Sequence, residues 1–222
     1  TTLLRHLKTV LSPHGSRTGT VRLNGIPLED IGLRQQAEKI GFVMQNPDDQ
    51  IVTDKVWHEL AFGLENLGME QSLMRLRVAE MASFFGIQDW FHREISQLSG
   101  GQKQLVNLAA IMAMQPEILI LDEPTSQLDP IAAADFLNTL KKINRELGTT
   151  ILITEHRTED IFPAADRVVV MEQGRITADG DPRTVALQLY ESGSQMFPAL
   201  PAPVRIFYGA DAQGTCPLTV RE

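Results

Sequence analysis

The segment Ile118-Leu119-Ile120-Leu121-Asp122-Glu123-Pro124 decides the fold. Four consecutive apolar residues predict a strand over 118–121 that is buried on both faces, as strands of parallel sheets are. Open α/β sheets bind ligands at the carboxyl ends of their strands. This strand ends in two acids, Asp122 and Glu123, so the segment predicts an α/β protein with a charged site at a strand end.

Apolar runs alternate with helical stretches on both sides of this strand, which is typical of a parallel sheet covered by helices. Further strands are expected at residues 20–23, 40–44 and 150–154, with a hairpin of 167–171 and 175–178 that turns at Gln173-Gly174. Helices are expected at residues 2–11, 55–67, 72–85, 101–114, 130–147 and 182–190. The predicted fold class is α/β, with a helical subdomain at about 54–115 and a small antiparallel β portion.

The composition is that of a globular chain and narrows the classes of partner. The 222 residues are 43% hydrophobic, and 28 Asp plus Glu against 20 Lys plus Arg give a net charge of -8. A nucleic-acid binder usually carries a basic surplus, so we expect no nucleic-acid partner. Cys216 is the only cysteine, which excludes an internal disulfide and a cysteine metal cluster. No apolar run reaches the roughly 20 residues of a membrane helix.

A second motif, Leu98-Ser99-Gly100-Gly101-Gln102, precedes a helical stretch. Glycines let phosphate oxygens approach backbone N–H groups, and a helix N-terminus adds partial positive charge, so the motif predicts an anion site. The alternative is a serine N-cap with a Gly-Gly loop.

For the acid pair, one interpretation is that Asp122 orients a magnesium ion while Glu123 polarises an attacking water. The other is that the pair only caps the next turn.

Three more motifs occur in a fixed order around these two. Gln45 ends a strand, Ser126-Gln127-Leu128-Asp129 follows the acid pair, and His156 ends the strand 150–154. With this series the sequence resembles the nucleotide-binding subunit of ATP-binding cassette (ABC) transporters over Thr1 to about Ala186. The five motifs are similar to the Q-loop, the signature, Walker B, the D-loop and the switch histidine of that family. The resemblance implies a P-loop NTPase-like parallel sheet core.

The resemblance also implies an ATPase with ATP and Mg²⁺ as cofactors and assigns residues to roles. Glu123 and His156 would be catalytic, and Thr1, Gln45 and Asp122 would serve the metal. The nucleotide-binding residues would be Thr1, Thr2, Gln45, Asp122, Ser99, Gly100, Gly101, Gln102 and Asp129.

The start of the chain, Thr1-Thr2-Leu3-Leu4-Arg5, is similar to the residues that follow the lysine of the Walker A motif. The resemblance therefore implies that a Gly-rich loop and a first strand precede residue 1. Without them, residues 1–222 alone are expected to bind ATP weakly and not to hydrolyse it.

A narrower resemblance lies between Gln45 and Gly68, where the sequence is similar to energy-coupling factor (ECF) importers of vitamins and transition metals. It implies three partners: a second ABC ATPase cassette, a transmembrane coupling protein and a substrate-binding membrane component. The subunit would lie peripherally on the cytoplasmic face of the membrane. The surface of residues 46–63 would contact the membrane component through partly exposed side chains, expected at Val56, Trp57, Leu60 and Phe62.

The end of the chain differs from the rest in its composition. Residues 1–191 are expected to form the ABC ATPase domain, and 192–222 a Pro/Gly-rich linker. Thr154-Glu155-His156-Arg157 is similar to the subgroup in which two cassettes are fused, so the chain would be the first cassette of a tandem. Within the linker, residues 204–208 are β-prone and expected to pair or pack locally.

Two other functions stay open. The first is a soluble ABC-type ATPase that acts on DNA or ribosomes, which the acidic charge and the mere 53 positions between Gln45 and Leu98 disfavour. The second is a regulatory cassette that binds nucleotide without turnover, which Glu123, His156 and the intact signature disfavour. The sequence does not identify the transported substrate.

Overall fold

The computed structural model describes residues 1–210 and 212–222, and it divides into two compact units, Thr1–Thr154 and Glu155–Glu222. The first unit contains helices α1 (Thr2–Arg5), α2 (Leu33–Lys39), α3 (Val56–Asn66), α4 (Gln71–Phe84), α5 (Gly100–Ala113) and α6 (Pro130–Leu147). Its strands are β1 (Arg22–Leu23), β2 (Ile26–Pro27), β3 (Ile40–Val43), β4 (Ile118–Asp122) and β5 (Thr150–Thr154). Short 3-10 turns lie at Thr9–Leu11, Leu28–Asp30, Pro47–Asp49, Gln88–Trp90 and Ile95–Gln97.

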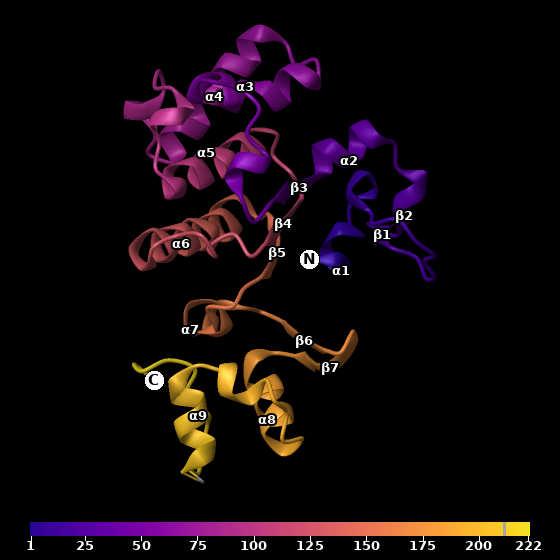
Figure 1. Cartoon of the computed structure of the whole chain (residues 1–222), viewed down its shortest axis with the longest axis vertical. Helices are drawn as coiled ribbons and strands as arrows, with labels where there is room; N and C mark the ends of the chain where they lie inside the picture. Colours follow the sequence, from indigo (N-terminus) through magenta and orange to yellow (C-terminus); the bar gives the residue numbers. More distant parts are fainter. Residues whose placement is uncertain (211) are drawn as a thin grey trace. The chain divides into compact units, whose positions relative to one another are not determined.

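The sheet of the first unit is parallel, in the order β3-β4-β5 (Figure 1). Its central strand is buried from Leu119 to Asp122, because it is paired on both edges and covered on both faces. The register places Val43 beside Leu121, and Asp122 beside Thr154. All three strands therefore end at the same edge, and the predicted α/β class with a parallel core is confirmed.

Helices α3, α4 and α5 pack against one another and form the helical part of this unit (Figure 1). Helix α5 also packs directly on β3 at Gly41. A Cβ built on Gly41 would lie 2.6 Å from Ile111 Cγ2, closer than real side chains approach. Glycine at this position therefore leaves room for the Ile111 side chain of α5 against the backbone of the strand.

Helix α6 begins and ends where the sequence predicts. Asp129 is its N-cap and accepts hydrogen bonds from two backbone N–H groups, Pro130 occupies the first turn, and Gly148 follows with a φ of 68°. An N-cap aspartate, a proline in the first turn and a glycine after the last turn are typical start and stop signals of helices. Its apolar side chains recur at helical spacing and bury one face, at Ala133, Phe136, Leu137, Leu140 and Ile143.

The first 30 residues differ from their predicted structure. The helix expected over 2–11 stops at Arg5, because the chain after it bonds elsewhere: Lys8 Nζ donates to the Ile40 carbonyl, and Thr9 donates twice to Gln36 Oε1. The strand expected over 20–23 is only β1, which forms a hairpin with β2. Asn24 and Gly25 both have positive φ and make its two-residue turn.

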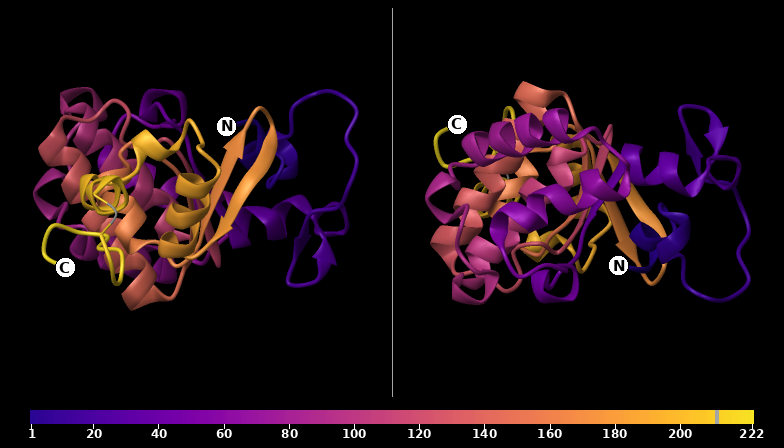
Figure 2. Two further views of the ribbon diagram at one scale, coloured as in Figure 1. Left: turned by 90° about the horizontal axis from the view of Figure 1, so that it is seen from below. Right: turned by 90° about the horizontal axis from the view of Figure 1, so that it is seen from above.

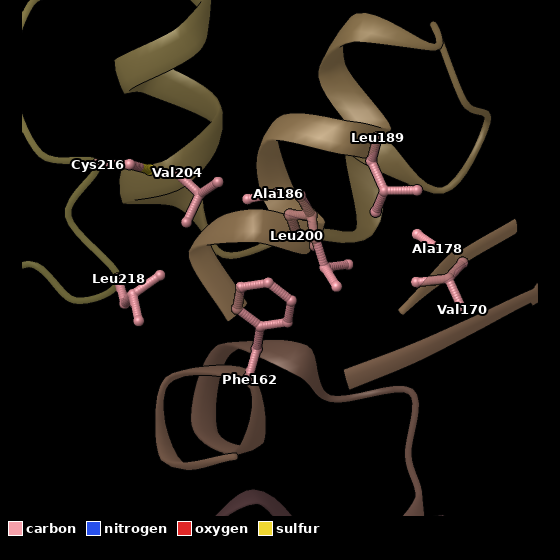
Figure 3. Packing of buried hydrophobic residues seen from close by; sticks show 10 residues of the cluster. Phe162, Val170, Ala178, Ala186, Leu189, Leu200, Val204, Cys216 and Leu218 are labelled. Carbon is pink, nitrogen blue, oxygen red and sulfur yellow. The ribbon is translucent and has the colours of Figure 1, made fainter. Parts of the chain in front are cut away.

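The second unit contains α7 (Thr158–Ile161), α8 (Pro182–Glu191), α9 (Ala202–Gly209) and the strands β6 (Val168–Glu172) and β7 (Arg175–Gly180). It also has 3-10 turns at Phe162–Ala164 and Phe197–Ala199. The strands form the predicted antiparallel hairpin, and α8 packs beside it (Figure 2). Phe162, Val170 and Leu189 belong to one buried cluster with Leu200 and Val204 (Figure 3).

The β-prone segment 204–208 does not form a strand and lies in helix α9. Val204 is fully buried in the cluster of the second unit, and Cys216 and Leu218 further along the chain are 5% exposed. Burial of an apolar helix face outweighs the β propensity of valine, isoleucine and aromatic residues. The expectation that this segment packs locally is confirmed.

Among the described residues, none of the helices combines the length and the apolar character that crossing a membrane requires.

Candidate functional site

The carboxyl ends of β3, β4 and β5 bring together residues that are far apart in the sequence. Gln45 follows β3, Asp122 and Glu123 end β4, and Thr154 ends β5. Gln45 Nε2 lies 3.3 Å from Glu123 Oε2. The sheet edge therefore carries two carboxylates, a carboxamide and a hydroxyl, and the carboxamide of Gln45 contacts the carboxylate of Glu123.

Asp122 is 5% exposed and accepts hydrogen bonds from two hydroxyls. Thr1 Oγ1 donates to its Oδ1 at 3.0 Å and Thr154 Oγ1 donates to the same atom at 3.2 Å. A buried carboxylate needs hydrogen-bond donors in place of the water it has lost. Thr1, the N-cap of α1, thus lies next to Asp122, and the sequence analysis assigns both residues to the metal.

Glu123 has an unusual backbone, with a φ of 48°. Its N–H donates to the Thr154 carbonyl at 3.0 Å and to the Thr154 hydroxyl at 3.2 Å, so the end of β5 holds this conformation. Left-handed backbone at residues other than glycine is uncommon and is concentrated at functional sites. The turn aims the Glu123 side chain toward Gln45 rather than back along the strand.

Ser99 and Gln102 form a capping box at the start of α5. Ser99 Oγ accepts from the Gln102 N–H at 3.3 Å, and Gln102 Oε1 accepts from the Ser99 N–H at 2.9 Å. A cavity of about 200 Å³ lies beside this turn, between α5 and α6. Its walls include Trp90, Leu105 and Phe136.

The two glycines of this motif have different surroundings. A Cβ on Gly101 would lie 3.1 Å from the Ala132 Cβ, so packing against α6 explains that glycine. Gly100 is exposed, has no positive φ, and a Cβ there would have no neighbour within 4 Å. The packing of the chain therefore gives no reason for glycine at position 100, whereas close approach of a ligand to the backbone would.

One predicted site residue, Asp129, has a local role in the fold. Asp129 caps α6, accepting from the N–H groups of Ile131 and Ala132 at 3.0 Å each. Thr2 is an exposed residue in the first turn of α1.

His156 belongs to the second unit, two residues after β5, and its N–H donates to Glu155 Oε2 at 3.2 Å. Its predicted place beside the γ-phosphate stays a prediction.

The structure also reveals residues that motif reasoning overlooked. Thr154 contacts both acids, and its signal in the sequence is its position at the end of the neighbouring strand. Gln104 is a fully buried polar residue on the apolar face of α5. A polar side chain at a core position of a helical pattern is the signal that would have found it.

Magnesium is the metal whose chemistry fits these donors. Thr1 and Asp122 offer oxygen ligands, which Mg²⁺ prefers, and Mg²⁺ usually takes only one or two protein ligands beside substrate phosphates. Within residues 1–210 and 212–222, no three His, Cys, Asp or Glu side chains are grouped closely enough to hold a metal.

The family described as ABC transporter matches residues 1–126. A protein of Bacillus thuringiensis subsp. konkukian, provisionally named an ABC transporter ATP-binding protein, is 50% identical over the whole chain. The chain covers 40% of that relative's length. The energy-coupling factor transporter ATP-binding protein EcfA1 of Symbiobacterium thermophilum is 43% identical over 84% of this chain and 64% of that protein.

Solved structures show the same fold. The structure of cbiO1 from Clostridium perfringens, described as part of the ABC transporter complex cbiONQ, matches with a TM-score of 0.76. It is 29% identical and covers 95% of this chain and 82% of its own. A dimeric ATP-binding cassette in a post-hydrolysis state with ADP and phosphate matches with a TM-score of 0.64 at 24% identity, over 75% of this chain and 74% of that one. This second likeness concerns the fold alone.

Proposed function

The chain belongs to the ABC transporter family, and from that premise we propose that it supplies an ATP-hydrolysing site to an importer of the energy-coupling factor type. The observation that carries the proposal is the contact between Gln45 and Glu123 beside the Asp122–Thr1 pair. A carboxylate held next to oxygen ligands for a metal is what phosphoryl transfer to water requires.

Glu123 is the proposed general base. Its carboxylate is partly exposed, so it can receive a proton from a water that attacks the γ-phosphate, and ADP and phosphate are the products. The Gln45 carboxamide at 3.3 Å orients that carboxylate by donating to one of its oxygens. The left-handed turn at residue 123 keeps the side chain at the strand end, where the substrate would lie.

Asp122 and Thr1 are the residues that would hold Mg²⁺. When bound, the metal supplies charge neutralisation for the phosphate oxygens. In this chain, Thr154 fixes the Asp122 carboxylate and thereby orients its other oxygen. His156 is proposed to contact the γ-phosphate.

Ser99, Gly100, Gly101 and Gln102 would bind the nucleotide held by a second cassette. The open space above Gly100 and the N-terminus of α5 support an anion there. Because each site would need the signature of the other cassette, hydrolysis depends on two cassettes meeting. The proposal includes a second cassette, fused to this chain or separate, the cytoplasmic face of the membrane as the location, and a vitamin or transition metal as the cargo.

Partly exposed apolar side chains near Gln45 support the ECF assignment and a membrane partner. Val52 is 65% exposed and Trp57 39% exposed. Val56 and Leu60, which were expected at this surface, are fully buried, because they form the inner face of α3. The proposed contact surface therefore consists of the loop 46–54 and the Trp57 side of α3, and similarity to EcfA1 and cbiO1 supports it.

Glu123→Gln tests the proposal, in the full-length protein with its membrane partners. The carboxamide keeps the shape and loses the base, so turnover should fall by roughly 10² to 10⁴ while ATP binding stays the same. Glu117→Gln, at the opposite end of β4, is the matched control and should keep full turnover. Unchanged hydrolysis in Glu123→Gln would remove the base from its role, and nucleotide binding without turnover in the unmodified protein would favour the regulatory cassette.

A further inference from the structure

Gln104 lies between the two residues whose side chains meet at the strand ends. It is 0% exposed, and its Nε2 donates to the Met44 carbonyl and to the Pro124 carbonyl, both at 3.2 Å. Met44 directly precedes Gln45, and Pro124 directly follows Glu123. One carboxamide therefore ties together the backbones that carry the Gln45–Glu123 contact.

The orientation of this carboxamide is fixed by its surroundings. Both neighbours are carbonyl oxygens, so the NH₂ group must face them. Gln104 Oε1 is buried, and no described residue donates to it. A buried acceptor without a donor lowers stability.

Gln36 shows what a buried glutamine in a purely structural role looks like in the same unit. It is 2% exposed, and both ends of its amide are used: Oε1 accepts twice from Thr9, and Nε2 donates to the Leu28 and Ile31 carbonyls. Gln104 makes half as many hydrogen bonds as Gln36, although it is at least as deeply buried. Hydrogen bonding within the core therefore explains a glutamine at position 104 less well than at position 36.

Two further side chains of α5 hold the other end of the loop that contains Gln45. Lys103 Nζ lies 2.7 Å from Asp48 Oδ1, and Asn107 Nδ2 donates to Gln50 Oε1 at 2.9 Å. Gln50 in turn bonds the Met44 N–H and the Phe42 carbonyl. The segment 44–50 is thus attached to α5 at both ends, and α5 is the helix that Ser99 caps.

We propose that Gln104 is a positioning residue for ATP hydrolysis, which sets the distance between the Gln45 carboxamide and the Glu123 carboxylate and makes that distance depend on the position of α5. The inference rests on the proposed function of Glu123 as the base. It gives the nucleotide bound at the start of α5 a direct physical connection to the hydrolytic residues of the same chain.

Removing both amide donors tests this. Gln104→Met keeps the length of the side chain and cannot donate, so Gln45 and Glu123 lose their common anchor. Displacements near 1 Å at a reacting group lower rates by up to about a hundredfold. We expect kcat to fall about 10- to 100-fold in the full-length protein, with KM for ATP changed less than about threefold, because ground-state binding is untouched.

A double-mutant comparison separates positioning from general damage. If Gln104 acts through Gln45, the fold-loss caused by Gln104→Met should shrink strongly when Gln45 is already alanine. Gln36→Met is the matched control: it deletes a buried glutamine of the same unit and should lower thermal stability while kcat of the folded protein stays unchanged. Gln104→Asn, which keeps the donors on a shorter side chain, replaces Gln104→Met if the latter does not fold, and the same loss is expected.

The outcomes are distinct. A kcat of folded Gln104→Met within twofold of the unmodified protein overturns the inference, and so does an equal fold-loss with and without the Gln45 side chain. In both cases the role of Glu123 stands. If Glu123→Gln hydrolyses ATP normally, the proposed function fails first and the inference fails with it.

Discussion

The hydroxyl of Thr154 donates to Asp122 Oδ1 at 3.2 Å, across the β4–β5 pair. The same hydroxyl accepts from the Glu123 N–H at 3.2 Å. Both acids of the candidate site are therefore held by one side chain from the neighbouring strand, and the parallel register of β4 and β5 positions that side chain.

Thr154→Val should impair the site without disturbing the strand. Valine has nearly the shape of threonine and a high strand propensity, but it leaves the buried Asp122 carboxylate with one donor fewer. The loss of a hydrogen bond to a charged group amounts to about 1.5–3 kcal/mol, so we expect turnover to fall at least tenfold. Steady-state ATPase rates at varied Mg²⁺ measure this.

Thr150→Val is the control for that substitution. Thr150 is exposed at the other end of β5, far along the strand from Asp122, and its replacement should leave the rate unchanged. Equal rates in both variants would mean that the Thr154 hydroxyl does not support the site.

Asp49→Lys should weaken assembly with the membrane component. Asp49 is exposed in the 3-10 turn Pro47–Asp49, within the proposed contact surface. Asp48 is unsuitable for this test, because its ion pair with Lys103 would be lost as well. Co-purification and transport should fall while ATP binding stays the same, and the charge reversal Asp30→Lys outside this surface should have no effect. Intact assembly in Asp49→Lys would refute the surface.

Leu200→Ala should destabilise the second unit. Leu200 is 5% exposed within its buried cluster, and leucine-to-alanine changes in a core cost about 2–5 kcal/mol (Figure 3). Ile206→Ala, at a position of α9 that is 69% exposed, should change the free energy of unfolding by less than about 0.5 kcal/mol. Urea titration followed by circular dichroism compares them. Equal effects would mean that residues after Glu191 are not packed as a core.

Alkylation of Cys216 should depend on pH in a defined direction. Burial raises the pKa of the Cys216 thiol, so the folded protein keeps the proton where an unfolded chain has lost it. Iodoacetamide labelling, followed by mass spectrometry, should reach half its maximum rate at a higher pH in buffer than in urea. The stabilisation linked to this thiol is complete below about pH 8.5 and is lost as pH rises through the folded pKa. Identical profiles in buffer and urea would contradict the burial.

Sequence patterns predicted the elements whose signals are local. Helix α6 has its cap, its proline and its terminal glycine in the sequence, and its bounds match the prediction. The segment 204–208 lacks such signals, and its packing against α8 and the 3-10 turn overrides its β propensity. The shortened α1 follows from bonds to Gln36 and Ile40, which lie some 30 residues away.

The candidate site divides in the same way. The acid pair could be predicted because the apolar strand and its two carboxylates are contiguous. The contact of Thr154 with Asp122 depends on strand register, and the contact of Gln104 with two distant carbonyls depends on how α5 lies on β3. Residue types and spacing predict neither contact, so both could be found only from the three-dimensional structure.

The left-handed backbone of Glu123 sets stability and activity against each other at a single residue. A non-glycine residue in this region costs roughly 1–3 kcal/mol, and glycine would adopt it without strain. Selection for a sturdier protein alone would therefore favour losing the carboxylate on which hydrolysis is proposed to depend. Laboratory evolution for thermal tolerance without selection for ATP hydrolysis should accumulate substitutions here, and the glutamate should persist only in lineages that are selected for the proposed hydrolysis.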